Sequence, residues 1–263
     1  MSRLMAFEKL NNTRDLGGMP TADGRRIRSG KLIRSGHLFA SSEADRAALA
    51  ALADAVVDFR TEKERREKPD PQLAGIAYHH LPILNDLTEG VTREREADEK
   101  AISLLMRDAG RAKGYMCGIY TGFVANAFSV EGYARFVRLL LAERDGALLW
   151  HCTAGKDRAG FASVIVEELL GVDRDAIKED YLRTNEHLMQ EVAALREMLR
   201  RSTGQVSEEA ELAMGYMFGA SEEYLDAAYS KADELYGGFE GFLEQGLRVT
   251  AEEKERLRHM YLE

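Results

Sequence analysis

Apolar and polar positions alternate in two different ways along the amino-terminal part of the chain. Short apolar runs rich in β-branched and aromatic residues predict strands over 53–60 (ADAVVDFR), 75–83 (GIAYHHLPI) and 146–151 (GALLWH). The stretch 24–36 (GRRIRSGKLIRSG) predicts two more short strands around a turn at Ser29-Gly30. All of these runs are too short to span a membrane.

Helical patterns lie between the predicted strands. The stretch 41–53 (SSEADRAALAALA) precedes one strand, and Thr61 followed by Glu64 forms a capping-box signature that opens a helix just after it. Strands that alternate with helices predict an α/β fold with a central, mainly parallel sheet flanked by helices. Ligands of such sheets bind at the carboxyl ends of the strands, where Asp58 and Cys152 fall.

The rest of the chain is predominantly helical in pattern. Segment 92–128 is a helical insertion with two adjacent apolar stripes, and segment 172–263 is helical to its end, with breaks near 202–204 and at Gly237-Gly238. The stripes are Tyr115, Ile119 and Phe123, and beside them Met116, Tyr120 and Val124. Only 4 prolines occur and no repeat is visible. We therefore expect a single domain over 1–263.

Composition narrows the choice of partners and compartment. The net charge of -9 opposes binding to nucleic acid and stable association with anionic membranes, so an anionic ligand must be held by local groups. The 2 cysteines are too few for a disulfide framework, and the amino-terminal stretch has no apolar run typical of a signal peptide. We expect a cytoplasmic protein, while export by a leaderless route stays open.

One polar loop carries the candidate chemistry. In LLWHCTAGKDRAG (148–160), an apolar strand runs into a turn that contains Cys152, Gly155 and Arg158, and a helical pattern follows. A tight loop that opens a helix directs backbone N–H groups at an anion, and an arginine adds a planar fork for two phosphate oxygens. The same groups stabilise a thiolate. Cys152 is therefore a candidate nucleophile toward phosphorus, forming a phosphocysteine.

A bare cysteine-to-arginine spacing also fits a buried apolar cysteine followed by a surface arginine. The preceding His151, the glycine, the apolar strand and the following helix favour a site over that interpretation. Cys117 differs, because it lies within the apolar helical stretch with no basic residue at comparable spacing, and we expect it to pack in the core.

The loop HCTAGKDRAG resembles the signature of cysteine-dependent protein tyrosine phosphatases. It is most similar to the bacterial group with a His-Cys-x-x-Gly-Lys-Asp-Arg loop, some of whose members also dephosphorylate phosphoserine or phosphoinositides. NTRDLGG (12–18), the 24–36 stretch, VVDFRTEKE (56–64) and the tail 236–258 also resemble that group, so the resemblance spans nearly the whole chain. It implies a fold like that of tyrosine and dual-specificity phosphatases.

The resemblance also implies roles for the loop residues. Cys152 would be the nucleophile, Arg158 the phosphate clamp, and His151 a support for the loop and its thiolate. Lys156 would stabilise the extra negative charge of polyphosphorylated substrates. Alternatively, it would pair with Asp58 or Asp157 to fix the loop. The residues expected to contact or frame the phosphoryl group are His151, Thr153, Ala154, Gly155, Lys156 and Asp58.

The general acid has two candidates. We favour Asp157 in the loop, whose other roles would be pairing with Lys156 or capping the helix. Asp86, which follows a predicted strand in LPILND, is the alternative, as ordinary relatives take the acid from an upstream loop. The insertion 92–128 lengthens the path from Asp86 to the cysteine loop. That insertion would be a lid over the site or a helical pair in the core.

Two positions depart from the pattern. Thr13 replaces the usual aromatic residue of the amino-terminal motif, and Ala159 stands where the superfamily has a Ser or Thr whose hydroxyl assists hydrolysis of the phosphocysteine. The Ala159 departure keeps a phosphate-binding pseudophosphatase open as the alternative to a phosphomonoester hydrolase. A rhodanese-like enzyme is a third hypothesis, but the helical carboxy-terminal part of the chain fits that class of enzyme poorly.

We expect phosphorylated protein or phosphoinositide substrates and inorganic phosphate as the product. We expect no cofactor and no metal. His79 and His80 are adjacent on a predicted strand, so their rings would face opposite sides.

Overall fold

A mixed sheet lies at the centre of the computed structural model, which describes residues 2–85, 105–188, 192–193, 197, 201 and 207–263. Within these residues its order is β1-β2-β3-β6-β4-β5. Strands β3, β6, β4 and β5 are parallel, whereas β1 and β2 run antiparallel at one edge. The predicted α/β fold with a mainly parallel sheet is confirmed. The bounds are β1 Arg3–Leu4, β2 Arg14–Asp15, β3 Leu32–Ser35, β4 Ala53–Asp58, β5 Ala77–His80 and β6 Ala147–His151.

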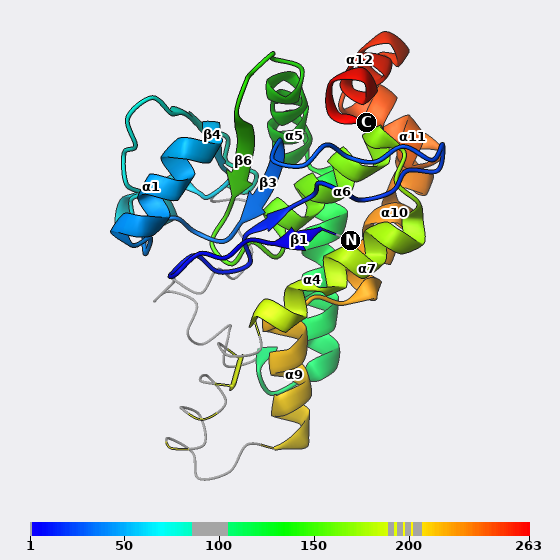
Figure 1. Ribbon diagram of the computed structural model, residues 1–263. Coiled ribbons are helices and arrows are strands. Elements are labelled where there is room, and N and C mark those ends of the chain that lie inside the picture. The colour runs from blue at the N-terminus through cyan, green and yellow to red at the C-terminus, as the bar shows by residue number, and fades with distance from the viewer. Residues whose placement is uncertain (1, 86–104, 189–191, 194–196, 198–200, 202–206) are drawn as a thin grey trace.

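The two faces of the sheet bury different side chains because successive residues of a strand point to opposite sides. On β6, Leu148 and Trp150 join the larger core, while Leu149 joins a smaller cluster on the other face. Helix α1 (Glu43–Leu52) covers the smaller cluster through Leu49. Helices α5 (Ala127–Leu140) and α6 (Arg158–Leu170) contribute to the larger core (Figure 1). Burial on both faces explains why the central strands read as continuous apolar runs.

The helical insertion contributes a core helix in its described part. Helix α4 (Ala109–Ala125) packs against α9 (Glu208–Phe218) and α10 (Glu222–Tyr236), with Tyr120, Phe123 and Val124 fully buried. Helix α4 ends at Asn126, whose side chain caps the start of α5. Helix α5 continues to Leu140, beyond the predicted end of the insertion at 128. Residues 92–104 lie outside the described residues. Cys117 is half-buried and packs against the core.

Helices also make up the described carboxy-terminal part, as predicted. They are α7 (Arg174–Leu182), α9, α10, the short α11 (Phe239–Gly241), a π-helical turn over Phe242–Gly246 and α12 (Ala251–Tyr261). The predicted break at Gly237 is confirmed, because this glycine ends α10 with a φ of 75°. The break predicted near 202–204 falls outside the described residues. No helix that the structure describes is long and apolar enough to cross a membrane.

The prediction of two strands around Ser29-Gly30 is wrong in its first half. Only Leu32–Ser35 forms a strand of the sheet, and Ile27 instead bridges Leu262 near the carboxyl terminus. Backbone hydrogen bonds from Arg26 and Arg28 to the last residues hold this arrangement. The local pattern suggested a hairpin, but a partner far along the sequence pairs with the segment.

The strand register aligns the residues that end the parallel strands. Ser35 of β3 and Asp58 of β4 both pair with His151 of β6, and Asp58 also pairs with His80 of β5. These residues form one row at the carboxyl edge of the sheet. The loop that follows β6 therefore begins in the middle of this edge, with the ends of β3 and β4 on either side.

Candidate active site

The loop from Cys152 to Arg158 connects β6 directly to α6. Gly155 has a φ of 71°, and a Cβ atom there would lie 2.7 Å from the carbonyl oxygen of Ser35. A glycine is required at this position both by its left-handed backbone and by the close approach of β3. Cys152 is only 2% exposed at the base of the loop.

Three carbonyl oxygens of the loop are bound from behind. Arg34 Nη2 donates to Gly155 O at 2.7 Å, Asn12 Nδ2 donates to Ala154 O at 3.2 Å, and the His37 amide donates to Thr153 O at 3.0 Å. In a planar trans peptide the N–H points away from the C=O. The amides of residues 154–156 therefore face the opposite side, an arrangement that suits an anion.

Behind the loop, the amino-terminal motif is anchored by buried charges. Arg14 and Arg34 both lie against Asp180, and Arg14 also donates to the Asp180 carbonyl at 3.2 Å. Burial, with the charge of Arg34, lowers the pKa of Arg14 to about 9. Thr13, the departure from the family motif, is fully buried and its hydroxyl lies 2.7 Å from Ser35 Oγ.

Arg158 is fixed by the carboxylate of Glu64, a residue that the sequence predicts only as part of a helix cap. Its Nη1 and Nη2 donate to the two oxygens of Glu64 at 2.6 and 2.8 Å, and Thr153 Oγ1 donates to Glu64 Oε1 at 2.7 Å. Burial would raise the pKa of Glu64, but Arg158 and Thr153 lower it to about 2. The Thr61–Glu64 capping box of α2 (Glu62–Glu67) is confirmed, and it sets Glu64 in place for this contact.

Asp157 is held by contacts from the helical part. Tyr120 of α4 donates its hydroxyl hydrogen to Asp157 Oδ1 at 3.0 Å, and the hydroxyl of Tyr181 lies 2.6 Å from that of Tyr120. Lys156 Nζ lies 3.4 Å from the same carboxylate. Asp157 is the N-cap residue of α6, yet its side chain makes no capping hydrogen bond. The helix-capping interpretation of Asp157 is therefore wrong.

Lys156 is turned toward the end of α9. Its ammonium group donates to Met217 O at 2.9 Å and to Gly219 O at 3.0 Å, and the residue is 3% exposed. The 3.4 Å distance from the ammonium group to Asp157 Oδ1 agrees with the alternative in which Lys156 pairs with Asp157. Asp58 instead binds Arg60 through both of its carboxylate oxygens.

A buried charged cluster lies beside His151 at the end of β6. His151 Nε2 is 3.2 Å from Asp70 Oδ2 and 3.9 Å from Asp58 Oδ1, and its Nδ1 is 3.2 Å from the Cys152 carbonyl oxygen. Asp58, Asp70 and His151 would be a possible set of metal ligands, since their ligand atoms lie within 4.8 Å of one another. However, the Arg60 guanidinium binds both carboxylates and already supplies a positive charge there. Asp70 was not recognised from the sequence, where it stands in a proline-containing connection.

Ala159 is fully buried at the start of α6. Its carbonyl oxygen accepts hydrogen bonds from Trp150 Nε1 at 3.1 Å and Ser163 Oγ at 3.0 Å. The neighbouring Arg158 carbonyl accepts from Tyr133 at 3.1 Å. These contacts secure the first turn of the helix, so its N–H groups stay oriented toward the loop.

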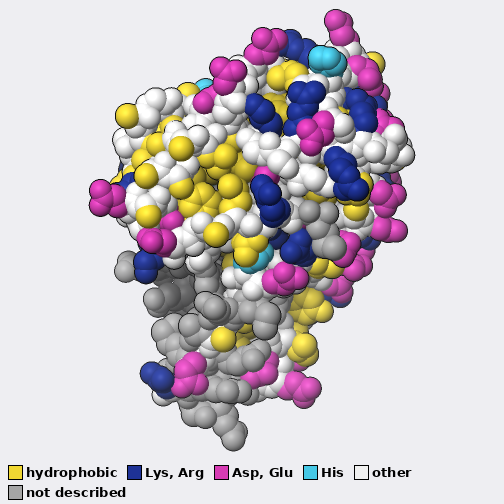
Figure 2. All heavy atoms as spheres, in the orientation of Figure 1, with side chains coloured by type: hydrophobic (Ala, Val, Ile, Leu, Met, Phe, Trp, Pro, Cys, Tyr) yellow, Lys and Arg dark blue, Asp and Glu magenta, His cyan; other side chains and the backbone are white. Residues whose placement is uncertain are grey.

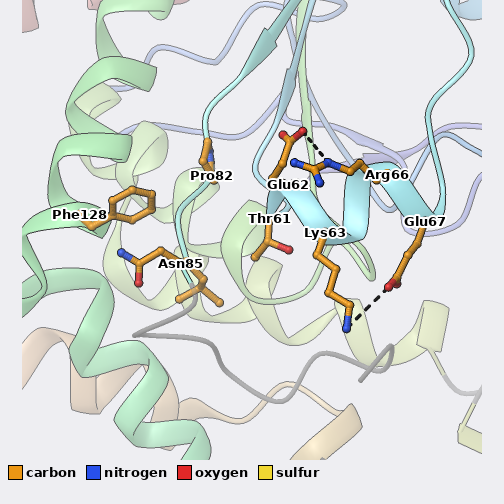
Figure 3. A pocket seen from close by; sticks show the side chains of 9 residues that line it. Thr61, Glu62, Lys63, Arg66, Glu67, Pro82, Asn85 and Phe128 are labelled. Carbon is orange, nitrogen blue, oxygen red and sulfur yellow. Dashed lines mark hydrogen bonds and ion pairs between the residues drawn. The ribbon is translucent and has the colours of Figure 1, made fainter. Parts of the chain in front are cut away.

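Helix α2 also borders an open groove of about 550 Å³ (Figure 3). Thr61, Glu62 and Lys63 face it on the α2 side, and Phe128 lies on the other side. The charged residues along its α2 wall pair with one another, Glu62 with Arg66 and Lys63 with Glu67. The alternative general acid, Asp86, lies outside the described residues.

Comparison with known proteins identifies the chain. A sequence profile of the tyrosine phosphatase family matches residues 5–263. The triple specificity protein phosphatase PtpB of Mycobacterium tuberculosis is 34% identical, over 88% of this chain and 90% of that protein. The chain belongs to the tyrosine phosphatase family. A Cupriavidus necator protein, provisionally named a tyrosine-protein phosphatase, is 33% identical to this phosphatase. The match covers 98% of the present chain and 88% of the Cupriavidus necator protein.

A solved structure was also compared with this tyrosine phosphatase. The Pseudomonas aeruginosa protein TpbA, in complex with phosphotyrosine, is 16% identical and covers 80% of this chain and 90% of its own, with a TM-score of 0.28. The mixed sheet flanked by helices and the helical carboxy-terminal part are the fold of this phosphatase, as the sequence predicted.

Proposed function

We propose that this tyrosine phosphatase hydrolyses phosphomonoesters through a phosphocysteine on Cys152. The observation that carries the proposal is the loop geometry, in which three carbonyls are bound from behind and Arg158 is fixed by Glu64. The amides and the guanidinium then converge on the space above the thiol, where a phosphoryl group would lie.

The proposed reaction has two steps. The Cys152 thiolate attacks phosphorus, the phosphorus–oxygen bond to the alcohol breaks, and Asp157 gives its proton to the departing oxygen. Water then attacks phosphorus, the sulfur–phosphorus bond breaks, and Asp157 takes back a proton from the water. The products are the alcohol, inorganic phosphate and the starting thiolate. Asp157 lies beside the loop as the N-cap residue of α6, which supports this assignment.

The substrates follow from the family and the surface. Phosphotyrosine in proteins is the proposed main substrate, and the triple specificity in the name of the related PtpB supports further substrate classes, which we propose to be phosphoserine and phosphoinositides. On the face shown in Figure 2, cationic and anionic side chains are interspersed rather than gathered into one basic patch. Because the net charge is -9, recognition of the anionic group is proposed to depend on the loop itself. We place the enzyme in the cytoplasm.

The first experiment measures hydrolysis of p-nitrophenyl phosphate in the presence of a chelator. We expect activity in the wild type and none in Cys152→Ser, which retains the shape of the loop but not the nucleophile. A folded wild-type protein that binds phosphate without turnover would instead support the pseudophosphatase alternative.

A second experiment tests the general acid. Asp157→Asn and Asp86→Asn are compared on p-nitrophenyl phosphate, whose leaving group needs little protonation, and on phenyl phosphate, whose leaving group needs it. The acid's variant should lose at least about tenfold more activity on phenyl phosphate. An equal loss on both substrates in Asp157→Asn, with the unequal loss in Asp86→Asn, would transfer the role to Asp86.

A further inference from the structure

Asp70 joins three connections at the carboxyl edge of the sheet. Its Oδ1 accepts the backbone N–H of Leu38, which follows β3, at 3.2 Å. Its Oδ2 accepts from Arg60 Nη2, which follows β4, at 2.5 Å, and lies 3.2 Å from Nε2 of His151 at the end of β6. The Asp70 side chain is 7% exposed and that of His151 is fully buried. The carboxylate thus contacts the segments that surround the cysteine loop.

The ring of His151 faces a hydrogen-bond acceptor at each nitrogen. Nδ1 lies 3.2 Å from the Cys152 carbonyl oxygen, and Nε2 faces the Asp70 carboxylate. A neutral imidazole carries only one N–H and would leave one of these buried acceptors against a lone pair. Only the doubly protonated ring can donate Nδ1–H to the carbonyl and also present a positive edge to Asp70, whose contact with Nε2 is an ion pair rather than an aligned hydrogen bond. The geometry therefore points to an imidazolium at this position.

The surrounding charges agree with a cationic ring. Two carboxylates, Asp58 and Asp70, share the single guanidinium of Arg60, so one negative charge is left for His151 to balance. Asp58 uses both oxygens on Arg60, which leaves Asp70 as the closer partner of the ring. Burial opposes charging, but the two carboxylates raise the pKa of His151 above its ordinary value against the opposing charge of Arg60.

We propose that Asp70 is a positioning residue of the phosphatase reaction, which keeps His151 doubly protonated and so holds a buried positive charge against the Cys152 peptide. The inference rests on the proposed thiolate mechanism. The cation has two consequences at the loop. It fixes the Cys152 carbonyl, and with it the direction of the thiol, and it favours the thiolate over the thiol by its charge.

The test follows the reactivity of Cys152 with iodoacetamide as a function of pH. Iodoacetamide is uncharged and does not compete for the loop amides, and mass spectrometry separates the Cys152 peptide from that of Cys117. In Asp70→Asn we expect the alkylation midpoint to rise by at least half a pH unit, which slows the reaction about threefold at pH values below the midpoint. The acid limb of kcat/KM for p-nitrophenyl phosphate should shift by the same amount.

Two controls distinguish positioning from general damage. Asp45→Asn removes another buried carboxylate, which lies in the first turn of α1 and accepts hydrogen bonds from the backbone amides of Glu8 and Lys9. This substitution should leave the alkylation midpoint unchanged. In a His151→Gln background, Asp70→Asn should cause no further shift, because its effect passes through the ring. An unchanged midpoint in folded Asp70→Asn, or an equal shift in both backgrounds, would overturn the proposal.

A measurement on the unaltered protein keeps the proposal testable if Asp70→Asn fails to fold. Nitrogen NMR of labelled histidine should show both ring nitrogens of His151 protonated at pH 7. A neutral ring would refute the role of Asp70, even in an active phosphatase. Absence of phosphatase activity in the wild type, or full activity in Cys152→Ser, would instead refute the thiolate mechanism on which the inference rests.

Discussion

Arg158 is held by a protein carboxylate at the end of the loop that contains Cys152. Two N–H groups are committed to Glu64, so the guanidinium plane is fixed before any substrate arrives. Under the proposed mechanism, the remaining donors would bind phosphate without further loss of side-chain freedom. At the scale of single residues, Glu64 is therefore the clearest target for mutation after Cys152 itself.

Glu64→Gln should lower kcat/KM for p-nitrophenyl phosphate by about tenfold or more, since an uncharged amide cannot hold both guanidinium nitrogens and the clamp loses its alignment. Steady-state kinetics measures the loss. Glu62→Gln is the matched control on the same helix, because Glu62 is half-exposed and its ion pairs are with Arg65, Arg66 and His80. Equal effects of the two substitutions would contradict the assignment.

The lowered pKa of Glu64 also predicts a pH dependence of stability. The folded-state pKa is about 2 against an ordinary value of 4.5, so the contribution of Glu64 is fully present above pH 4.5 and is lost as the pH falls toward 2. Its size is about 3 kcal/mol. Urea unfolding of wild type and Glu64→Gln should converge in stability between pH 4.5 and pH 2. Parallel curves across that range would exclude the effect.

Ala159 predicts slow hydrolysis of the phosphocysteine. Without a hydroxyl next to Arg158, we expect a burst of p-nitrophenol equal to the enzyme concentration, followed by a slower steady state. Stopped-flow kinetics should show a smaller burst and faster turnover in Ala159→Ser. Ala162→Ser, which also adds a hydroxyl to a fully buried position of α6, serves as the control. A wild-type trace without a burst would contradict the prediction.

The chemistry of single residues could be predicted only where it lies within one short stretch. Cys152, Gly155 and Arg158 follow from local spacing. Glu64 was visible as half of a capping box, but its contact with Arg158 bridges 94 positions of sequence and depends on the strand register. Asp70 was not found at all, because nothing in its neighbourhood indicates that His151 lies beside it.

Among the elements, α4 connects the helical insertion to the loop. Its apolar stripe was predicted correctly, and Tyr120 lies in the core as that stripe requires. The stripe could not reveal that the Tyr120 hydroxyl reaches Asp157, since that contact is set by where the helix packs. Whether the insertion also covers the site as a lid stays a prediction.

Tyr120→Phe should impair catalysis while preserving the packing of α4. We expect kcat on phenyl phosphate to fall about three- to tenfold, because Asp157 loses the donor that orients it, with a smaller loss on p-nitrophenyl phosphate. Thr121→Val alters the next position, whose hydroxyl donates to Gly118 O within the helix, and should have no effect. A loss of equal size on both substrates would argue against an effect through Asp157.

For the whole molecule, the carboxy-terminal helix is part of the core rather than an appendage. Tyr261 of α12 is 3% exposed and its hydroxyl donates to Leu140 O at 2.8 Å, which ties the end of the chain to α5. Backbone hydrogen bonds from Arg26 to Glu263 and from Arg28 to Tyr261 also connect the amino-terminal part of the chain to its carboxyl end. These contacts support the expectation of one domain.

Tyr261→Ala should therefore destabilise the entire protein. We expect a loss of about 3–5 kcal/mol in the free energy of unfolding, from the cavity and the lost hydrogen bond. Urea unfolding followed by both circular dichroism and tryptophan fluorescence should give one shared transition at a lower midpoint. His259→Ala, on an exposed position of the same helix, should leave the midpoint in place. Separate transitions for the two probes would speak for independent units.

The anchoring of the loop by Asn12, Arg34 and Glu64 also determines the stage of folding at which Cys152 would become reactive. These contacts bridge 142, 121 and 94 positions. Closing such long loops costs chain entropy that only the assembled sheet repays, so they form late in folding. A nascent or partly refolded chain would consequently carry a Cys152 thiol that the loop has not yet activated. Under the proposed mechanism, Cys152 would become a nucleophile only once the surrounding fold encloses it, which would limit oxidation and alkylation of the unfinished chain.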